Sequence, residues 1–330
     1  MAFTTPLFLP FENGGLSFPE GRGLFLNAEL PVGIDHNFWR PRLNCVQQWR
    51  DRYLQLQRAR YEVETTPAVY GKADFAIVTI GKHRAEVEAN IIYASEHVTK
   101  GAPIVIGGHK RSGAAAIKSW LAKQTELVSS ISKHHWQTVV IHAGEVTLEA
   151  TATRSTVRGF ETAPGMFSSE HVDEGSAFLV EALPDGHLGN LADFGCGWGY
   201  LSVEAIRACG ADSVALVDAH SSSLKSAERN FSSHHPSIKS QSHWLDLTQE
   251  ETGERYDTIL MNPPFHNGGA ADPEIGPKFI ESAAQHLKPG GVLYAVANRH
   301  LPYERQLQVN FKRVETIAES NRYKVFRALR

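Results

Sequence analysis

The sequence of 330 residues is poor in cysteine and has no long apolar run. Its three cysteines lack the spacing of a metal site, so no metal is predicted and a reducing compartment is favoured. Without an apolar run of about 18 residues, no transmembrane helix is predicted. The amino terminus has no basic segment followed by an apolar one, so no export signal is expected. These absences indicate a cytoplasmic protein, and its length predicts two domains with sizeable cores.

The chain also carries little net charge, −3, which by itself argues against a nucleic-acid enzyme. The two halves differ, however. Residues 1–160 hold 18 Lys and Arg against 14 Asp and Glu, a net charge of +4, whereas residues 161–330 hold 15 against 22, a net charge of −7. The basic residues of the first half are clustered, and the candidates for phosphate contact are Arg50, Lys82, Arg84, Lys110 and Arg111. An exposed helix face is the ordinary alternative, above all for Arg50, which lies in a helix predicted from Val46 to Tyr61.

What the sequence does contain is a short motif, Asn262-Pro263-Pro264-Phe265, directly after an apolar run from Tyr256 to Met261. The run predicts a buried parallel strand, and the two prolines end it and restrict the turn beyond. An Asn amide oxygen and a proline carbonyl can then accept both hydrogens of a planar NH2 group, while the aromatic ring stacks on the base. The alternative is a strand-ending turn closed by a core phenylalanine.

A glycine-rich turn precedes this motif, Asp193-Phe194-Gly195-Cys196-Gly197-Trp198-Gly199, between a short apolar strand and a helix predicted from Tyr200 to about Ala208. Glycines let the backbone approach a ligand closely at the amino terminus of that helix. The third glycine comes one position too early for the dinucleotide fingerprint. An acidic residue on the strand suits the sulfonium and amino group of S-adenosylmethionine better than a pyrophosphate. The residues expected to bind this cofactor are Asp193, Gly195, Cys196, Gly197 and Gly199, with Cys196 as a small side chain and not a nucleophile.

Two further carboxylates are candidates for the same cofactor. Asp218 ends the apolar strand predicted from Ser213 to Val217, where a carboxylate can accept from both ribose hydroxyls. Asp246 can accept from the adenine amino group, although a solvated turn residue is an equal alternative. The irregular segment around Phe167 precedes a helix that Asp173 caps and that ends at Leu183, and it either folds over the cofactor or links the domains. Together these residues specify a methyltransferase.

The motif also predicts the chemistry of the acceptor. The exocyclic amine of a purine is a poor nucleophile because its lone pair is delocalised into the ring. Hydrogen bonds to Asn262 and the Pro263 carbonyl favour a pyramidal nitrogen and direct its lone pair toward the sulfonium methyl group. No strong base and no metal are needed, since the proton can leave after the methyl group arrives. Phe265 is expected to stack on a base turned out of its helix or loop, and His266 to line the pocket or contact phosphate, with a general-base role as the alternative.

The first half contains a second, similar pattern. The segment 74–83 aligns with 257–266, the segment 98–106 aligns with 287–295, and 136–140 is similar to 323–326. No glycine-rich turn precedes the first copy, and Thr79-Ile80-Gly81-Lys82 stands where the second has Met261-Asn262-Pro263-Pro264. We therefore predict two tandem Rossmann-like α/β methyltransferase domains, a degenerate and RNA-binding one at 1–160 and a catalytic one at 161–330. Chance similarity of two βαβ segments is the alternative.

The chain resembles the ribosomal RNA guanine-N2 methyltransferases of the small-subunit methyltransferase C type and their large-subunit relatives. The resemblance covers nearly the whole chain and is tightest from Gly165 to Arg330. Besides the glycine-rich turn, it rests on Gly165-Met166-Phe167-Ser168 with Asp173-x-Gly175-Ser176, Asn262-Pro263-Pro264-Phe265-His266-x-Gly268, Asn298-Arg299-His300-Leu301-Pro302-Tyr303, and Lys324-Val325-Phe326-Arg327-Ala328.

This resemblance implies N2-methylation of one guanine in ribosomal RNA by a class I S-adenosylmethionine-dependent enzyme. By this likeness the cofactor is held by Asp193, Gly195 and Asp218, and the acceptor by Asn262, Pro263 and Phe265. Residues 1–70 match the family poorly, and residues 298–300 lean toward the large-subunit branch, so the ribosomal subunit and the nucleotide stay open. The expected partner is ribosomal RNA or a ribosomal subunit, and neither a membrane nor a metal is expected. The sequence leaves the oligomeric state open, and a monomer is slightly favoured.

Two classes of alternative remain. The same Asn-Pro-Pro-aromatic motif serves methylation of adenine N6 in DNA or RNA and of glutamine amides in release factors. Phe in place of Tyr at position 265, the duplicated basic half and His266 favour guanine. The other alternative is a non-catalytic RNA-binding assembly factor that has kept the cofactor fold, and an intact set of site residues argues against it.

Overall fold

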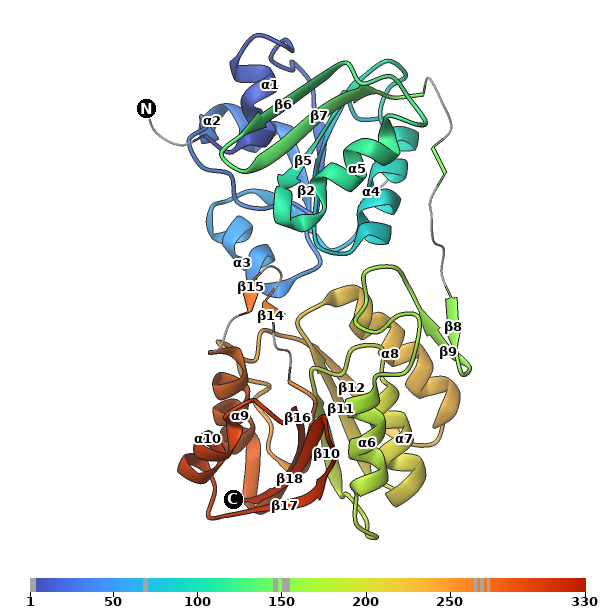
Figure 1. The fold of residues 1–330 in the computed structure, drawn as a ribbon, viewed down its shortest axis with the longest axis vertical. Helices are drawn as coiled ribbons and strands as arrows, with labels where there is room; N and C mark the ends of the chain where they lie inside the picture. Colours follow the sequence, from blue (N-terminus) through green and yellow to red (C-terminus); the bar gives the residue numbers. More distant parts are fainter. Residues whose placement is uncertain are drawn as a thin grey trace. The chain divides into compact units, whose positions relative to one another are not determined.

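Figure 1 shows the computed structural model of the chain, which describes residues 4–67, 71–144, 148–149, 155–263, 266–267, 270–271 and 274–330. The chain divides into two units, Met1–Thr153 and Arg154–Arg330, and each holds one seven-stranded sheet. The hairpin of β8 (Ser155–Val157) and β9 (Phe160–Thr162) belongs to the second unit, because Phe160 is buried in the core of that unit. A division after residue 160 would pass through this hairpin.

The first sheet has the strand order β3-β2-β1-β4-β5-β7-β6, in which β7 runs antiparallel to both of its neighbours and the other pairs are parallel. Its strands are β1 (Gly23–Leu26), β2 (Leu43–Val46), β3 (Glu62–Glu64), β4 (Phe75–Thr79), β5 (Pro103–His109), β6 (Ser129–Lys133) and β7 (Trp136–His142). The α-helices are α1 (Leu9–Glu12), α2 (His36–Trp39), α3 (Arg50–Arg58), α4 (Arg84–His97) and α5 (Ala114–Leu121). Short 3-10 turns are η1 (Pro6–Phe8), η2 (Arg40–Arg42) and η3 (Lys110–Ser112).

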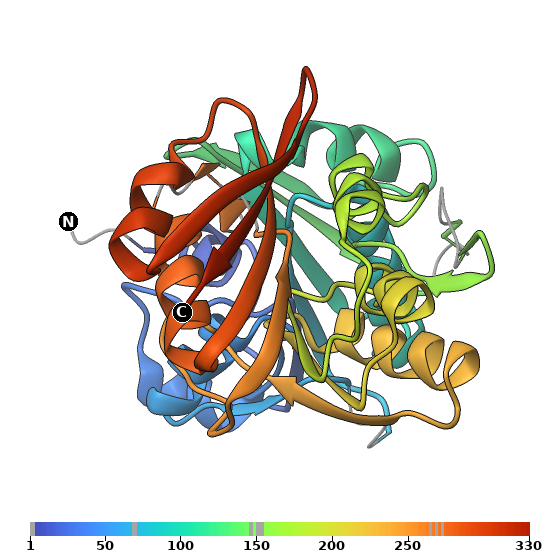
Figure 2. The same cartoon turned by 90° about the horizontal axis from the view of Figure 1, so that it is seen from below.

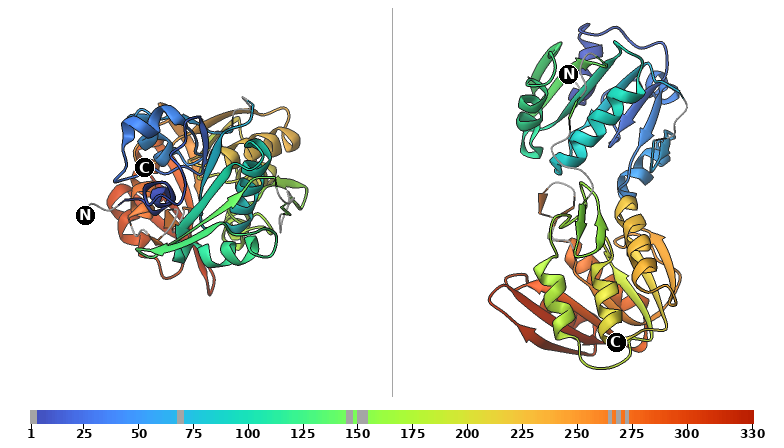
Figure 3. Two further views of the ribbon diagram at one scale, coloured as in Figure 1. Left: turned by 90° about the horizontal axis from the view of Figure 1, so that it is seen from above. Right: turned by 90° about the vertical axis from the view of Figure 1, so that its right-hand side faces the viewer.

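Both faces of the first sheet are buried. Leu24 and Leu26 of β1 pack with α4 and α5 on one face, and α4 lies along the sheet in Figure 3. Phe25 points to the other face, as the alternation of side chains along a strand requires. There it joins Phe8 and Trp39, whose rings meet edge to face with centroids 4.9 Å apart. Residues of the amino-terminal 70 thus supply one side of this core.

The second sheet has the order β12-β11-β10-β13-β16-β18-β17, and β18 runs antiparallel to its neighbours. Its strands are β10 (Asn190–Phe194), β11 (Ser213–Asp218), β12 (Lys239–Trp244), β13 (Tyr256–Met261), β16 (Leu287–Asn298), β17 (Arg313–Glu319) and β18 (Tyr323–Leu329). A small pair is formed by β14 (His266–Asn267) and β15 (Ala270–Ala271). The helices are α6 (Glu174–Ala182), α7 (Tyr200–Cys209) and α8 (Ser221–His234) on one face, and α9 (Ile275–His286) and α10 (Tyr303–Asn310) on the other (Figure 2).

The two sheets have the same strand order and the same strand directions, so the predicted duplication is confirmed in the topology. Their registers also align the copies residue by residue. Leu26 pairs with Val78 in the first sheet and Phe194 pairs with Met261 in the second, so Val78 corresponds to Met261. Thr79 therefore stands at the position of Asn262. The alignment of 74–83 with 257–266 holds, and the match of Thr79 to Met261 was wrong by one residue.

Each copy also repeats one hydrogen bond at the amino end of its first strand. The Arg22 N–H donates to the Asp74 carboxylate at 2.8 Å, and the Asn190 N–H donates to the Asp257 carboxylate at 3.0 Å. A glycine precedes each donor, and a Cβ on Gly21 would lie 1.8 Å from an Asp74 oxygen. A shared contact with a shared steric requirement favours duplication over chance similarity.

One predicted helix was placed wrongly. Val46 ends β2, and α3 begins only at Arg50, because the Trp49 N–H donates to the side chain of Gln47 in a turn between them. The helix predicted from Tyr200 and the helix capped by Asp173 are confirmed as α7 and α6. Within the described ranges, no helix has the length and apolar character needed to cross a bilayer.

Candidate cofactor and acceptor site

Several predicted site residues meet at the carboxyl edge of the second sheet. Strands β10, β11 and β13 are parallel neighbours, so the residues that follow them lie at one edge, where open α/β sheets bind ligands. A cavity at this edge is lined by Phe167, Gly195, Cys196 and Gly197 together with Asn262. Five other predicted residues that the structure describes, Asp193, Gly199, Asp218, Asp246 and Pro263, are not part of its wall. Side chains that the sequence did not assign to it also line the cavity, among them Asp173, Ser176 and Trp198.

The glycine-rich turn needs its glycines for two different reasons. Gly197 has a φ of 55° and Gly199 a φ of 90°, a conformation that side chains disfavour. A Cβ on Gly199 would also lie 3.0 Å from the Cα of Ala227 in α8, so the turn packs directly on that helix. Open space surrounds the corresponding position on Gly197, which leaves its backbone accessible to a ligand. The turn leads directly into α7, as predicted.

Asp193 is the most deeply buried acid of the site, with 1% of its surface exposed. One carboxylate oxygen accepts the Ser202 N–H at 3.0 Å, and the other has no partner among the described residues. Burial raises the pKa of the Asp193 carboxyl to about 7. Burying an acceptor without a partner costs folding free energy. A cationic or hydrogen-bonding ligand would supply the partner that this oxygen lacks.

Asp218 supports the turn from the neighbouring strand. Its two carboxylate oxygens accept the Gly197 N–H at 2.8 Å and the His220 N–H at 2.7 Å. Desolvation raises the pKa of the Asp218 carboxyl to about 6, against the opposing effect of these backbone donors. The carboxylate is thereby fixed at the tip of β11, next to the turn, with acceptor capacity left for a ligand.

Asp246 and Cys196 have local partners. The Asp246 carboxylate accepts the Thr248 N–H at 3.0 Å, the Thr248 hydroxyl at 2.7 Å and the Gln249 amide at 2.6 Å. It thus organises the turn after β12, and contact with adenine stays a prediction. Burial raises the pKa of the Cys196 thiol well above its usual value, so the thiolate that a nucleophile requires is disfavoured.

Asn262 follows β13 and is held from α6. Its amide nitrogen lies 2.8 Å from the Asp173 carboxylate and 2.9 Å from the Ser176 hydroxyl. Asp173 is also the N-cap of α6, as predicted, and it accepts the Ser176 N–H. Pro263 is buried beside Asn262. Pro264, Phe265 and the side chain of His266 lie outside the described residues, so their roles stay predictions.

Phe167, in the irregular segment before α6, is one of the residues that line the cavity. The Trp198 indole N–H donates to the Phe167 carbonyl at 2.9 Å, which ties this segment to the glycine-rich turn. The Phe167 side chain is 58% exposed, so a large apolar surface lies free at the rim of the cavity. Ser168, which follows it, has a positive φ of 53°.

The first unit has different residues at the equivalent positions. When the two sheets are aligned by the pairing of their strands, Phe25 corresponds to Asp193, Gln47 to Asp218 and Thr79 to Asn262. The Gln47 amide donates to the Ala28 carbonyl at 2.7 Å, and the Asn27 amide donates to the Thr79 carbonyl at 3.2 Å. The first unit thus has neither the two carboxylates nor the glycine-rich turn. Instead, the side chains of Gln47 and Asn27 donate hydrogen bonds to backbone carbonyls at the ends of its strands.

Four of the predicted phosphate contacts gather at the carboxyl edge of the first sheet. Lys82 and Arg84 follow β4, and Lys110 and Arg111 follow β5 in η3. The turn 133–135 joins them, because the Lys110 N–H donates to the His135 carbonyl at 2.8 Å. These residues are exposed, although Arg84 forms an ion pair with Glu88. Arg50 begins α3, after β2 of the same sheet.

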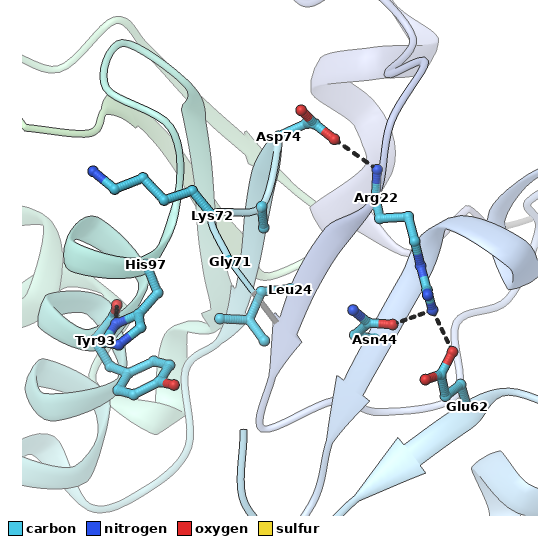
Figure 4. Close-up of a pocket in the computed structure, with 10 residues that line it drawn as sticks. Arg22, Leu24, Asn44, Glu62, Gly71, Lys72, Asp74, Tyr93 and His97 are labelled. Carbon is cyan, nitrogen blue, oxygen red and sulfur yellow. Dashed lines mark hydrogen bonds and ion pairs between the residues drawn. The ribbon is translucent and has the colours of Figure 1, made fainter. Parts of the chain in front are cut away.

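A cavity of about 440 Å³ in the first unit lies at the opposite edge of that sheet (Figure 4). Its lining residues stand near the amino ends of the strands and at the end of α4, and Arg22, Glu62 and Asp74 among them are bonded to one another. The Arg22 guanidinium contacts both Asn44 and Glu62, and the backbone N–H of Arg22 donates to the Asp74 carboxylate. The cavity is therefore not the counterpart of the site in the second unit. The described residues hold no group of three or more His, Cys, Asp or Glu that could bind a metal ion.

Comparisons with known proteins agree with this geometry. Residues 158–327 match the family model of the methyltransferase small domain. The ribosomal RNA small subunit methyltransferase C of Psychromonas ingrahamii is 31% identical over 282 residues, which cover 80% of this chain and 78% of that protein. The protein of the same name from Shewanella pealeana is 36% identical over 162 residues, 49% of this chain and 46% of that protein.

A solved structure is similar over both units. It is the T. thermophilus 16S rRNA N2 G1207 methyltransferase in complex with AdoMet and guanosine. The match has a TM-score of 0.78 and 24% identity, and it covers 96% of this chain and 90% of that chain. The likeness confirms the predicted fold of two tandem α/β methyltransferase domains.

Proposed function

This chain belongs to the ribosomal RNA small subunit methyltransferase C family, and we propose that it transfers a methyl group from S-adenosylmethionine to the N2 amine of one guanine in ribosomal RNA. The observation that carries the proposal is the position of Asn262 in the same cavity as the glycine-rich turn. The names of the relatives favour the small subunit over the large-subunit branch to which residues 298–300 pointed.

The residues of the second unit fit the cofactor. S-Adenosylmethionine supplies, when bound, an electrophilic methyl group on a positively charged sulfur. The free oxygen of Asp193 suits its cationic amino group, and the remaining lone pairs of Asp218 suit the ribose hydroxyls. The proposed set is completed by Phe167, Gly195, Cys196, Gly197, Gly199 and Asp246.

The acceptor amine is proposed to bind between Asn262 and Pro263. The Asn262 amide and the Pro263 carbonyl would accept its two hydrogens and orient the nitrogen lone pair toward the methyl group. Positioning and fixed dipoles then lower the barrier, and the proton leaves to solvent after transfer. Stacking by Phe265 would hold the base after it has left its helix or loop.

The first unit is proposed to bind RNA and not cofactor. Its counterparts of Asp193 and Asp218 are uncharged, whereas Lys82, Lys110 and Arg111 are exposed at the same edge. Clustered cations near strand ends suit the phosphates of an RNA chain, and the affinity they supply depends on salt. Because ribosomal RNA is the proposed substrate, a cytoplasmic location follows.

The test is transfer of labelled methyl groups from S-adenosylmethionine to naked ribosomal RNA and to isolated ribosomal subunits, followed by digestion to nucleosides. We expect the label in N2-methylguanosine. Label in adenosine, or in a glutamine-bearing protein offered in parallel, would replace the guanine assignment. Tight RNA binding with no transfer to any acceptor would favour the non-catalytic assembly factor instead.

A further inference from the structure

Both hydrogens of the Asn262 amide nitrogen are donated within the protein. The nitrogen lies 2.8 Å from Asp173 Oδ2 and 2.9 Å from Ser176 Oγ. These acceptors lie at the start of α6, and Asp173 precedes Asn262 by 89 residues in the chain. The residue that ends β13 is therefore held by the first turn of a distant helix.

This arrangement fixes the orientation of the planar amide. If the amide turned over, its oxygen would meet the Asp173 carboxylate, which has no hydrogen to donate. The inverted orientation would lose a hydrogen bond to a charged group and place two acceptors against each other. The amide oxygen is thus held on the edge away from α6, and Asn262 presents an acceptor to a base.

We propose that Asp173 and Ser176 are positioning residues for methyl transfer, which act through Asn262 and make the site selective for a base that carries an amino group. The inference deepens the proposed function and rests on it in one respect, the contact between Asn262 and the acceptor amine. A base with a hydrogen or a keto oxygen in place of the amine offers no donor, and the amide oxygen then loses its partner.

Gly175 belongs to the same arrangement. A Cβ at this position would lie 3.1 Å from Asp173 Oδ2 and 3.2 Å from the Tyr323 ring, both tighter than ordinary contacts. A side chain would therefore push the carboxylate away from Asn262. The sequence Asp173-x-Gly175-Ser176 thus combines a helix cap that is also an acceptor, a position without a side chain, and a second acceptor.

The informative substitution is Asp173→Ser. Serine caps helices as well as aspartate does, but its shorter side chain loses the contact with Asn262. Ser176→Ala removes the second acceptor and leaves the cap in place. Asp173→Asn is the conservative variant, because its amide oxygen can still accept from Asn262. Asp35→Ser is the matched control, since Asp35 is the side-chain N-cap of α2 in the first unit.

Four quantities are measured for each variant: kcat with ribosomal RNA, the dissociation constant of S-adenosylmethionine, the thermal midpoint, and the ratio of the dissociation constants of inosine and guanosine with S-adenosylhomocysteine present. Inosine lacks the amino group. We expect Asp173→Ser to lower kcat by about 10- to 100-fold and Ser176→Ala by about 3- to 10-fold. Both should bring the inosine-to-guanosine ratio closer to one and leave cofactor affinity within about twofold. Asp173→Asn should retain most of kcat and of the ratio, and Asp35→Ser should change neither.

Unchanged kcat and an unchanged nucleoside ratio in Ser176→Ala and Asp173→Ser would overturn the inference. Equal losses in Asp173→Asn and Asp173→Ser, with weakened cofactor binding, would also overturn it, because the carboxylate would then act on the cofactor's charge. If Asp173→Ser does not fold, Ser176→Ala decides alone. Guanine labelling by the unaltered protein does not depend on these variants, so the proposed function can stand when this inference fails.

Discussion

Replacing Asp193 by asparagine should stabilise the protein without cofactor and weaken its binding of S-adenosylmethionine. Asp193 is 1% exposed, and burial raises the pKa of its carboxyl from 3.8 to about 7. The folded protein then holds this proton more tightly than the unfolded chain does, so the free energy of unfolding falls as pH rises from about 4 to about 7. This rise in pKa corresponds to roughly 4 kcal/mol at most.

Asparagine keeps an acceptor for the Ser202 N–H but has no charge to bury. In urea unfolding at pH 8 without cofactor, we expect Asp193→Asn to be more stable than the unaltered protein by up to about 4 kcal/mol. At pH 5 the gain should shrink by more than half, since most of the native carboxyl is then protonated. Calorimetric titration at pH 8 should show cofactor binding weakened by about 10- to 100-fold. A stability difference that is the same at both pH values would refute the reasoning.

Three further predictions concern the cofactor, the acceptor and the RNA. Cofactor affinity of the unaltered protein should fall as pH drops from 8 to 5, because the Asp193 and Asp218 carboxyls, with pKa values of about 7 and about 6, become protonated and lose their negative charge and part of their acceptor capacity. Titration calorimetry across this range measures the change. Asn262→Ala should abolish methyl transfer in the labelling assay and leave the cofactor dissociation constant nearly unchanged, and retained activity would contradict the role of Asn262. Replacing Lys110 and Arg111 by alanine should raise the KM for RNA and lower the slope of log affinity against log salt by about 1.4 to 1.8. Lys123→Ala, an exposed lysine beyond the end of α5, should leave that slope unchanged and serves as the control.

Local patterns predicted the parts of this site that depend on the backbone. An apolar run followed by glycines or prolines defines both where a strand ends and which edge of a parallel sheet it reaches, so the placement of Gly197 and Asn262 at one edge followed from the sequence. The duplication was also visible, because strand registers preserve residue spacing. Its one-residue error at Thr79 arose because no glycine or proline marks the end of β4.

Contacts between distant segments were beyond such patterns. Asp173 was predicted as a helix cap from its neighbours, but its bond to Asn262 depends on how α6 packs against β13. The predicted start of α3 was too early because the sequence pattern does not show the turn at Gln47. That turn is formed by a hydrogen bond from the Trp49 N–H to the Gln47 side chain. The hairpin at the domain boundary joins the second unit through the burial of Phe160, which composition does not show.

The central claim is that a fixed amide beside the bound sulfonium accepts the amino group of a base. A crystal structure of the protein with S-adenosylhomocysteine and guanosine tests this most directly. It should show the Asn262 amide oxygen within hydrogen-bond distance of the guanine N2 atom, with that atom facing the cofactor sulfur and the amide nitrogen still bound to Asp173. An amide turned away from the sulfur, with packed side chains between them, would contradict the account.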